Sequence, residues 1–363
     1  MKHVTVGHRI LTHEGLKKGF LGIDGEDYAE ISWGDPPPGT PRALILPAFV
    51  NAHSHIGDSA AYPAPKGSVK EIVGPPDGFK HRMLRSRTSA EKVDAMKQAV
   101  QVMRASGTAL FADFREEGVE GLNALRSVES DDWPRALVLS RPSNLKATRD
   151  EITALLSSSD GLGLSAISDW NADDLSLMSR EARKAGKLFA IHASEAVRED
   201  IDAILDLKPS FLVHMCRAAD DDIVACRDAN IPIVVCPNSN HFFGLDPHIP
   251  GLLRAGLSVA LGTDNGMIVR PDILAELKAA YAISSAEAKV EPMEIVRLAT
   301  FGGRKVLNVD AKITTEISGN TELLVIRTSG DDPLGDLVTR SRSEDIIATV
   351  RGGKVRRTSA WTT

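Results

Sequence analysis

Short apolar runs alternate with longer stretches of helical periodicity along the middle of the chain. The stretches at residues 89–107 and 171–187 carry a glycine at their ends, Gly107 and Gly186, as helices often do, and a third helix is expected at residues 194–207. Strands that alternate with helices predict a parallel sheet, and eight of them favour a (β/α)8 TIM barrel. An open doubly wound sheet is the alternative, but no Gly-x-Gly-x-x-Gly follows a strand. The eight strand candidates are residues 44–50, 108–114, 136–139, 162–167, 188–191, 211–213, 231–235 and 257–261.

The two ends of the chain have a different pattern. Short β-rich runs at residues 4–6, 9–12 and 20–23 precede the breaker cluster GDPPPGTPR, and the C-terminal part contains TELLVIRTS and DIIATVRGGKVRR. Gly352-Gly353 is typical of a hairpin turn. Neither end has enough apolar strand to build a core alone. We therefore predict a composite β-sandwich of residues 1–48 and 308–363, with the barrel at residues 49–307.

Composition narrows the class of partner. The formal net charge is −6 and the isoelectric point is near 6.0, so neither nucleic acid nor an anionic membrane is favoured, and a small molecule is the better expectation. Three cysteines, Cys216, Cys226 and Cys236, form no close pair, which argues for a reducing compartment. There is no apolar segment of signal-peptide or membrane-spanning length, so a cytoplasmic protein is predicted.

Polar residues stand at the ends of the predicted strands. His53 and His55 are two residues apart at the end of an apolar strand, so both can face one object. TIM barrels place their chemistry at the carboxyl ends of strands, and imidazole nitrogen suits Zn²⁺ or Fe²⁺. Each of these residues alone could be structural, but burying such a set without partners is costly. The further strand-end residues are Asp113, Arg115, His192, His214 and Asp264.

The segments NAHSH, HASE, FLVH, CPNSN and GTDN occur in this order. This series resembles the amidohydrolase superfamily, and more closely its branch of cytosine deaminases, guanine deaminases and chlorohydrolase-like enzymes. The resemblance covers nearly the whole chain, because relatives also carry a β-sandwich built from both termini. It implies one divalent metal, Zn²⁺ with Fe²⁺ as the alternative, bound by His53, His55, His192 and Asp264. It further implies that Glu195 and His214 act beside the metal, and it is compatible with a homo-oligomer.

The chemistry of such a site follows from its groups. A metal with one open position lowers the pKa of bound water from about 15.7 toward 7. Asp264 can accept the proton of this water, and His214 can orient the water or polarise the substrate. Glu195 can protonate a ring nitrogen and pass the proton to the leaving amine, which requires a raised pKa. The structural alternative for Glu195 is stabilisation of a helix N-terminus.

An absence separates the reaction classes. Two-metal relatives carry a bridging carboxylated lysine at the end of strand 4, but GLGLSAISDW at residues 161–170 has no lysine. A single metal is therefore expected, and deamination is favoured over cyclic-amide hydrolysis. Glu195 also weakens dechlorination, because chlorohydrolase-like relatives can lack this glutamate.

Substrate recognition is expected in the loops after the strands. The longest loop, residues 57–86, is rich in Pro and Gly and suits an ordered lid or a plain surface excursion. Arg115, Asn144, Asn240 and Asn265 are candidates for substrate binding, with local turn or strand-end hydrogen bonding as the alternative.

Together these features predict hydrolytic deamination of a heterocyclic amine by a metal-activated water. The alternatives are hydrolysis of an amide, amidine or chloro-heterocycle at the same mononuclear site, and a catalytically silent barrel that keeps the metal.

Overall fold

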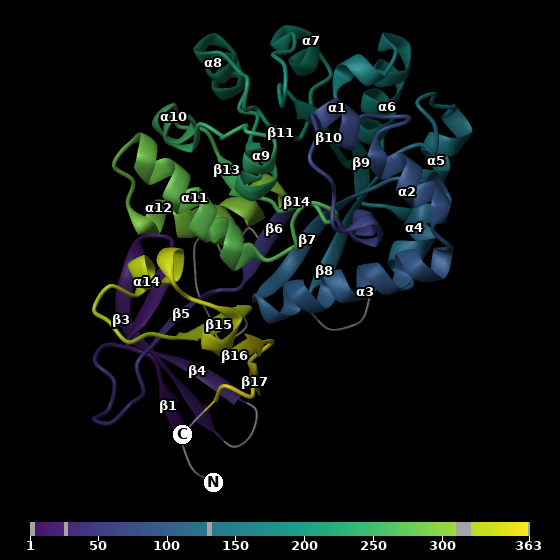
Figure 1. Cartoon of the computed structure of the whole chain (residues 1–363). Helices are drawn as coiled ribbons and strands as arrows, with labels where there is room; N and C mark the ends of the chain where they lie inside the picture. The colour runs from purple at the N-terminus through teal and green to yellow at the C-terminus, as the bar shows by residue number, and fades with distance from the viewer. Residues whose placement is uncertain (1–3, 25–27, 129–132, 310–320, 362–363) are drawn as a thin grey trace.

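The alternating apolar segments form one parallel sheet in the computed structural model of the chain, which describes residues 4–24, 28–128, 133–309 and 321–361 (Figure 1). Its strand order is β13-β12-β11-β10-β9-β8-β7-β6-β14. β13 and β14 are two pieces of the last strand, and β14 pairs with β6, where Asp264 is opposite Ser54. The sheet therefore closes on itself, and the predicted TIM barrel is confirmed. The strands are β6 (Phe49–His55), β7 (Thr108–Arg115), β8 (Arg135–Ser140), β9 (Gly161–Leu164), β10 (Leu188–Ala193), β11 (Phe211–His214), β12 (Ile233–Val235), β13 (Val259–Leu261) and β14 (Asp264–Asn265).

Helices surround this sheet, and two of the predicted ones begin and end close to where the sequence indicates. Thr88 caps α3 in a reciprocal capping box with Glu91, and Asn171 caps α6. Gly107 and Gly186 follow these helices with φ of 83° and 66°, a conformation that glycine adopts at little cost. The helices after the strands are α3 (Ser89–Ala105), α4 (Gly118–Arg126), α5 (Arg149–Ser158), α6 (Ala172–Lys184), α7 (Ile201–Asp206), α8 (Asp220–Asp228), α10 (Ile249–Arg254) and α11 (Ile273–Glu287).

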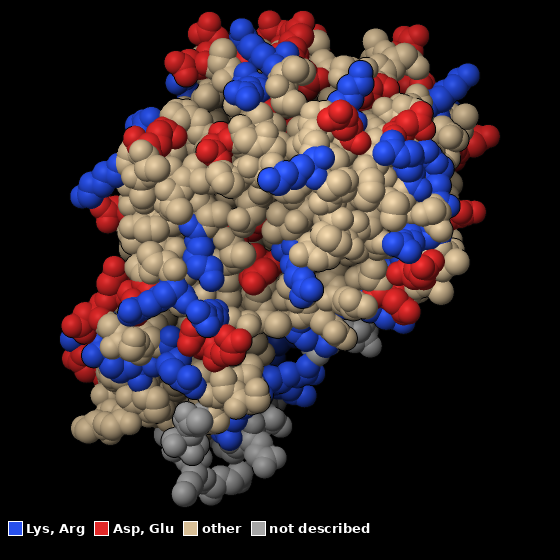
Figure 2. All heavy atoms as spheres, viewed as in Figure 1, with Lys and Arg blue, Asp and Glu red and all other residues tan. Residues whose placement is uncertain are grey.

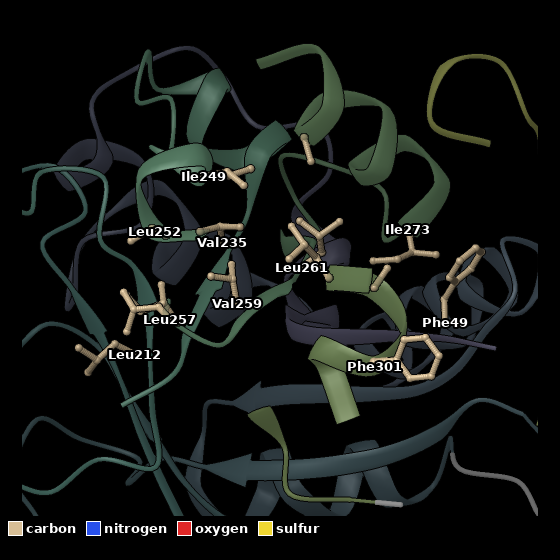
Figure 3. Packing of buried hydrophobic residues seen from close by; sticks show 14 of the residues in the cluster. Phe49, Leu212, Val235, Ile249, Leu252, Leu257, Val259, Leu261, Ile273 and Phe301 are labelled. Carbon is tan, nitrogen blue, oxygen red and sulfur yellow. The ribbon is translucent and has the colours of Figure 1, made fainter. Parts of the chain in front are cut away.

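Shorter helices complete the chain. α1 (Val69–Ile72) and α2 (Phe79–Ser86) lie in the long segment after β6, and α9 (Pro237–Phe242) follows β12. α12 (Pro292–Arg297) runs through a π-helical turn (Leu298–Gly302) into α13 (Gly303–Val306), and α14 (Pro333–Thr339) packs on α11 and α12. Apolar side chains fill the space between these helices and the barrel, as Figure 3 shows for Val235, Leu261 and Ile273.

Several predicted elements differ from the structure in extent. The strand predicted at residues 162–167 ends at Leu164, and those predicted at 231–235 and 257–261 begin at Ile233 and Val259.

Two further elements were wrong in a way that bears on the site. Residues 44–50 form two strands, because the hydrogen-bond partner changes at Ala48, whose N–H donates to Glu322 O (2.8 Å), while Phe49 N–H donates to Gly107 O (3.0 Å). Residues 194–207 are helical only in α7, because Ser194 and Glu199 bond to each other through both side chains and both backbone N–H groups. Glu195 therefore lies in a loop and not in the first turn of a helix.

The N- and C-terminal segments join in one small mixed sheet, seen as purple and yellow strands in Figure 1. β3 pairs with β4 as well as with β1 and β2, so the sheet curls until its edges meet. Gly352 and Gly353, with φ of 55° and 78°, form the predicted hairpin turn between β16 and β17. The proposed division at residues 48/49 and 307/308 stays a prediction. The strands are β1 (Val4–Val6), β2 (Arg9–Thr12), β3 (Gly15–Asp24), β4 (Tyr28–Trp33), β5 (Ala43–Pro47), β15 (Leu323–Arg327), β16 (Ile346–Arg351) and β17 (Lys354–Arg357).

Charged groups of both signs are intermixed over the face of the molecule seen in Figure 2. Among the described residues, no helix is long and apolar enough to cross a membrane.

Candidate active site

Four side chains from three strands converge at the carboxyl end of the barrel. His53 Nε2 lies 3.1 Å from Asp264 Oδ1, and His55 Nε2 lies 3.6 Å from the same oxygen. His192 Nε2 lies 3.3 Å from His55 Nε2. One ligand atom from each of the four lies within 4.8 Å of the others, so the four predicted metal ligands form one cluster.

The backbone explains why these side chains meet. His53 and His55 are alternate residues of β6 and so share a face. Asp264 is in β14, hydrogen-bonded beside β6, whereas His192 arrives on β10 from across the barrel. Asp264 has φ of 55°, and two further residues at strand ends, Ser194 and His214, have φ of 46° and 78°. Such left-handed conformations cost roughly 1–3 kcal/mol for residues other than glycine, and they gather here at the barrel mouth.

The hydrogen bonds of two histidines test whether a metal fits the cluster. His192 Nδ1 is 2.6 Å from Leu164 O, which can only accept, so Nδ1 carries the proton and Nε2 a lone pair. Burial alone would lower the pKa of His55, but the Glu116 carboxylate raises it. His55 Nδ1 faces a Glu116 carboxylate oxygen at 3.1 Å, so in the neutral ring, the form that a metal binds, His55 Nε2 is also a bare acceptor. Two lone pairs 3.3 Å apart cannot bond each other, and a cation between them removes the conflict. The donor set, three imidazoles and a carboxylate, fits one divalent metal.

Charge states in the cluster agree with this role. Burial lowers the pKa of His53 to about 3, so its imidazole is neutral, as a ligand must be. Burial alone would raise the pKa of Asp264, but the His53 hydrogen bond and the nearby histidines hold it well below its ordinary value. Its second oxygen, Oδ2, accepts a hydrogen bond from Ser239 Oγ at 2.5 Å. The carboxylate is therefore ionised and held in one orientation.

Glu195 and His214 lie next to the cluster. Glu195 Oε1 is 3.8 Å from His214 Nε2, and burial raises the pKa of Glu195. Asn240 Nδ2 donates to His214 Nδ1 at 3.0 Å, which places the His214 proton on Nε2, toward Glu195. A carboxyl with a raised pKa beside an N–H donor is suited to moving protons.

A cavity of about 450 Å³ opens onto this group of residues. Its walls include His55, His192, Glu195, His214 and Asp264. Residues of the long segment after β6 form part of the opposite wall, at Val69, Lys70, Val73, Gly74, Pro75 and Lys80. That segment therefore covers the site, which agrees with the interpretation of residues 57–86 as an ordered lid.

The four substrate-binding candidates do not share this cavity. Asn265 lines it, and donates from Nδ2 to Asp58 Oδ2 at 2.9 Å. Asn240 is buried behind His214, and Asn144 is exposed with its amide on Ser143 Oγ.

Arg115 also lies away from the cavity. It is 2 % exposed, and its guanidinium bonds to Asp113 Oδ1 at 3.4 Å and to Glu116 Oε2 at 3.0 Å. It packs so closely on Gly57 that a Cβ there would lie 2.1 Å from Nη1. Arg115 therefore lies at a strand end, as predicted, but its side chain belongs to a cluster of ion pairs and not to the cavity wall.

Sequence reasoning missed this cluster of buried charges. Glu116 Oε1 accepts from Lys80 Nζ at 2.7 Å and from Arg141 Nη2 at 2.9 Å, in addition to facing His55. Lys80 Nζ also lies 3.3 Å from Asp58 Oδ2. His55, Asp58 and Glu116 could hold a second cation, but the Lys80 ammonium already lies there. Glu116 could have been found as a charged residue directly after a strand, whereas Lys80 has no such signal.

Comparison with known proteins places this architecture. The chain is 35% identical over 341 residues to a putative aminohydrolase of Archaeoglobus fulgidus, covering 93% of this chain and 94% of the relative. It is 25% identical to a 5-methylthioadenosine/S-adenosylhomocysteine deaminase of Haloquadratum walsbyi, covering 86% and 79%.

The fold is shared with a solved structure of an atrazine chlorohydrolase from Arthrobacter aurescens complexed with zinc and atraton. The TM-score is 0.78 at 14% identity, over 99% of this chain and 96% of the other. The family profile for the amidohydrolases matches residues 44–356, which span both the barrel and the pairing of the terminal segments. With this match and the 35% identical relative, the chain belongs to the amidohydrolase family.

Proposed function

We propose that this protein hydrolytically deaminates a small heterocyclic amine at a single divalent metal, most simply zinc. The observation that carries the proposal is that one cavity is lined by three of the four metal-type ligands, His55, His192 and Asp264, together with the Glu195 carboxyl, whose pKa is raised, and the His214 N–H donor. The fourth ligand, His53, is fully buried beside them. Relatives named as deaminases support the same reaction class.

Each residue has a proposed part. His53, His55, His192 and Asp264 would hold the metal, which when bound supplies a nucleophile from water at neutral pH. Asp264 accepts the proton that this water loses, because its carboxylate is ionised. Ser239 keeps one of the Asp264 oxygens occupied, so the other is directed at the reacting centre.

Glu195 is proposed as the group that moves the proton between substrate atoms. It protonates the ring nitrogen next to the carbon under attack, and the carboxylate so formed takes the proton of the added hydroxyl group and delivers it to the amine, which leaves as ammonia. The proton that Asp264 accepted from water then restores the acid form of Glu195. Burial raises its pKa, which favours the protonated carboxyl that the first of these steps needs. His214 donates from Nε2 to the reacting oxygen, and Asn240 fixes that tautomer from behind.

Zinc is proposed as the metal because imidazole nitrogen and carboxylate oxygen are among its preferred ligands, with iron as the alternative for the same donor set. The chlorohydrolase of the same fold was crystallised with zinc. A second metal is disfavoured, because Lys80 lies in the neighbouring set of carboxylates and no lysine ends the fourth strand.

The cavity limits the substrate. Its apolar wall, from Val69, Val73 and Ala193, can cover the face of a ring, while Asn265 and Arg141 offer donors at the edge. A volume of about 450 Å³ admits a heterocycle with a modest substituent.

The test is an ammonia-release screen of zinc-loaded protein over aminopurines, aminopyrimidines, pterins and triazines. Release from one compound class, absent after chelation and restored by zinc, is the expected result. The matched control is Glu195→Gln, which should keep its metal and release ammonia about 10²- to 10⁴-fold more slowly. Chloride release from chlorotriazines without ammonia from any amine would contradict the proposal.

A further inference from the structure

Residues 57–86, which we call the cover segment, connect β6 to α3 across the mouth of the barrel. They carry α1 and α2, and six of their residues line the cavity together with the proposed catalytic groups. Most of the segment's charged residues, such as Lys66 and Lys70, are exposed. Lys80 differs, because only 5 % of its side chain is accessible.

Lys80 is the cationic contact between the cover segment and the barrel wall. Its Nζ is 2.7 Å from Glu116 Oε1, at the end of β7, and 3.3 Å from Asp58 Oδ2, at the start of the segment. An ammonium is costly to bury without such partners, so the observed position requires both carboxylates. Withdrawing Lys80 would leave Asp58 with the Asn265 amide, and Glu116 with its two arginines.

The same oxygen of Glu116 reaches the proposed metal ligand His55. Glu116 Oε1 lies 3.1 Å from His55 Nδ1, and this contact leaves Nε2 free to bind metal. Lys80 and Arg141 also donate to Oε1 and hold it from two directions. Ligand orientation by a hydrogen-bonded carboxylate is worth about 10- to 100-fold in metal affinity.

We propose that Lys80 is a positioning residue that joins closure of the cover segment to the metal-binding orientation of His55, through Glu116. When the segment lies over the cavity, Lys80 fixes Glu116, and Glu116 fixes the His55 ring. When the segment lifts, Glu116 loses one of its donors and His55 is held less firmly. The inference rests on the proposed metal site and adds that the cover segment and the metal stabilise each other.

Reciprocity supplies a test on the unmodified protein. If closure strengthens metal binding, metal binding must strengthen closure by the same factor. Hydrogen exchange of residues 57–86 should therefore slow about tenfold when zinc is added to the chelated protein. Exchange in this segment that zinc leaves unchanged, in protein that does bind zinc, would overturn the inference. Wild-type protein that binds no zinc would instead overturn the proposed function on which it rests.

Lys80→Met gives the second test, with Lys66→Met as the matched control on an exposed lysine of the same segment. Lys80→Met should lower zinc affinity about tenfold in competition with a chelator, and should speed proteolytic cleavage within residues 57–86. Lys66→Met should change neither. A loss of metal affinity with unchanged cleavage, or the reverse, would show that the two are not joined.

The route through Glu116 is tested by Glu116→Gln alone and together with Lys80→Met. If Lys80 acts through Glu116, the double variant should lose no more zinc affinity than Glu116→Gln alone. Losses that multiply would overturn the route. A thermal unfolding transition confirms that each variant is folded, and the hydrogen-exchange test on the wild type decides the question should Lys80→Met fail to fold.

Discussion

Two glutamates on different sides of the barrel mouth, Glu116 and Glu195, lie in opposite electrostatic settings. Beside β6 and β7, Glu116 is surrounded by Lys80, Arg115 and Arg141. Burial would raise the pKa of Glu116, but Lys80, His55 and Arg141 hold it well below its ordinary value. Beside β10 and β12, burial raises the pKa of Glu195, and it raises the pKa of Glu276 to about 8.

The difference in pKa suggests different roles: Glu116 can fix the orientation of its neighbours, whereas Glu195 can exchange protons. Glu116, fully paired with cations, is suited to fixing its neighbours in place. Glu195 has no cation within hydrogen-bonding distance among the described residues, and burial raises its pKa, which suits a group that exchanges protons. The central cluster lies between these sides and combines imidazole nitrogens with an ionised carboxylate, a donor set that suits a divalent cation.

The largest effect is expected at Asp264, in the cluster of proposed metal ligands. Asp264→Asn removes the ionised ligand and the acceptor of the water proton, so turnover should fall below detection while the fold is kept. Turnover number and circular dichroism measure the two outcomes. Near wild-type turnover would remove Asp264 from its proposed role.

Glu195→Gln tests the proposed role of Glu195 in moving protons. We expect kcat to fall by about 10²- to 10⁴-fold with metal content unchanged, because the variant cannot exchange a proton. In the wild type, activity should decline as pH rises through the raised pKa of Glu195, because the acid form is needed, and the variant should lack this limb of the profile. Loss of metal in the variant would make Glu195 a ligand or a ligand support.

Glu276, on the same side of the barrel mouth as Glu195, should make the free energy of unfolding depend on pH. Its folded pKa of about 8 exceeds the ordinary 4.5, so the folded state binds the proton more tightly. Its contribution is fully present below about pH 4.5 and is lost as pH rises toward 8. Between these limits, the unfolding free energy of the wild type should fall relative to Glu276→Gln by about 1 kcal/mol per pH unit. Urea denaturation of chelated protein measures this, and parallel pH curves would contradict it.

The smallest effect on activity is expected at Asn144. Asn144 is exposed and lies away from the cavity, so Asn144→Ala should leave kcat/KM within about twofold. A larger loss in steady-state kinetics would mean that the loop after β8 reaches the substrate.

The barrel, and the meeting of His53, His192 and Asp264 at its rim, could be predicted from the sequence for a physical reason. His53, His192 and Asp264 each end or follow an apolar run, and the closure of a parallel sheet gathers such ends at one rim. Alternation of strands and helices carries this information locally, so one chain is sufficient to infer it.

Side-chain direction and long-range pairing could not be inferred in this way. Arg115 occupies a strand end as predicted, but whether it faces the cavity or Asp113 depends on packing against Gly57. Lys80 reaches Glu116 from a segment without regular periodicity, so no local pattern indicates the contact. The loop at Glu195 depends on reciprocal bonds between Ser194 and Glu199, which override the helical character of that stretch.

Metal content per chain tests the central claim most directly. Elemental analysis of protein purified without chelator should give one equivalent of divalent metal, and His192→Ala should lower it well below one while remaining folded. Two equivalents in the wild type, or an unchanged single equivalent in His192→Ala, would contradict a mononuclear centre built from His53, His55, His192 and Asp264.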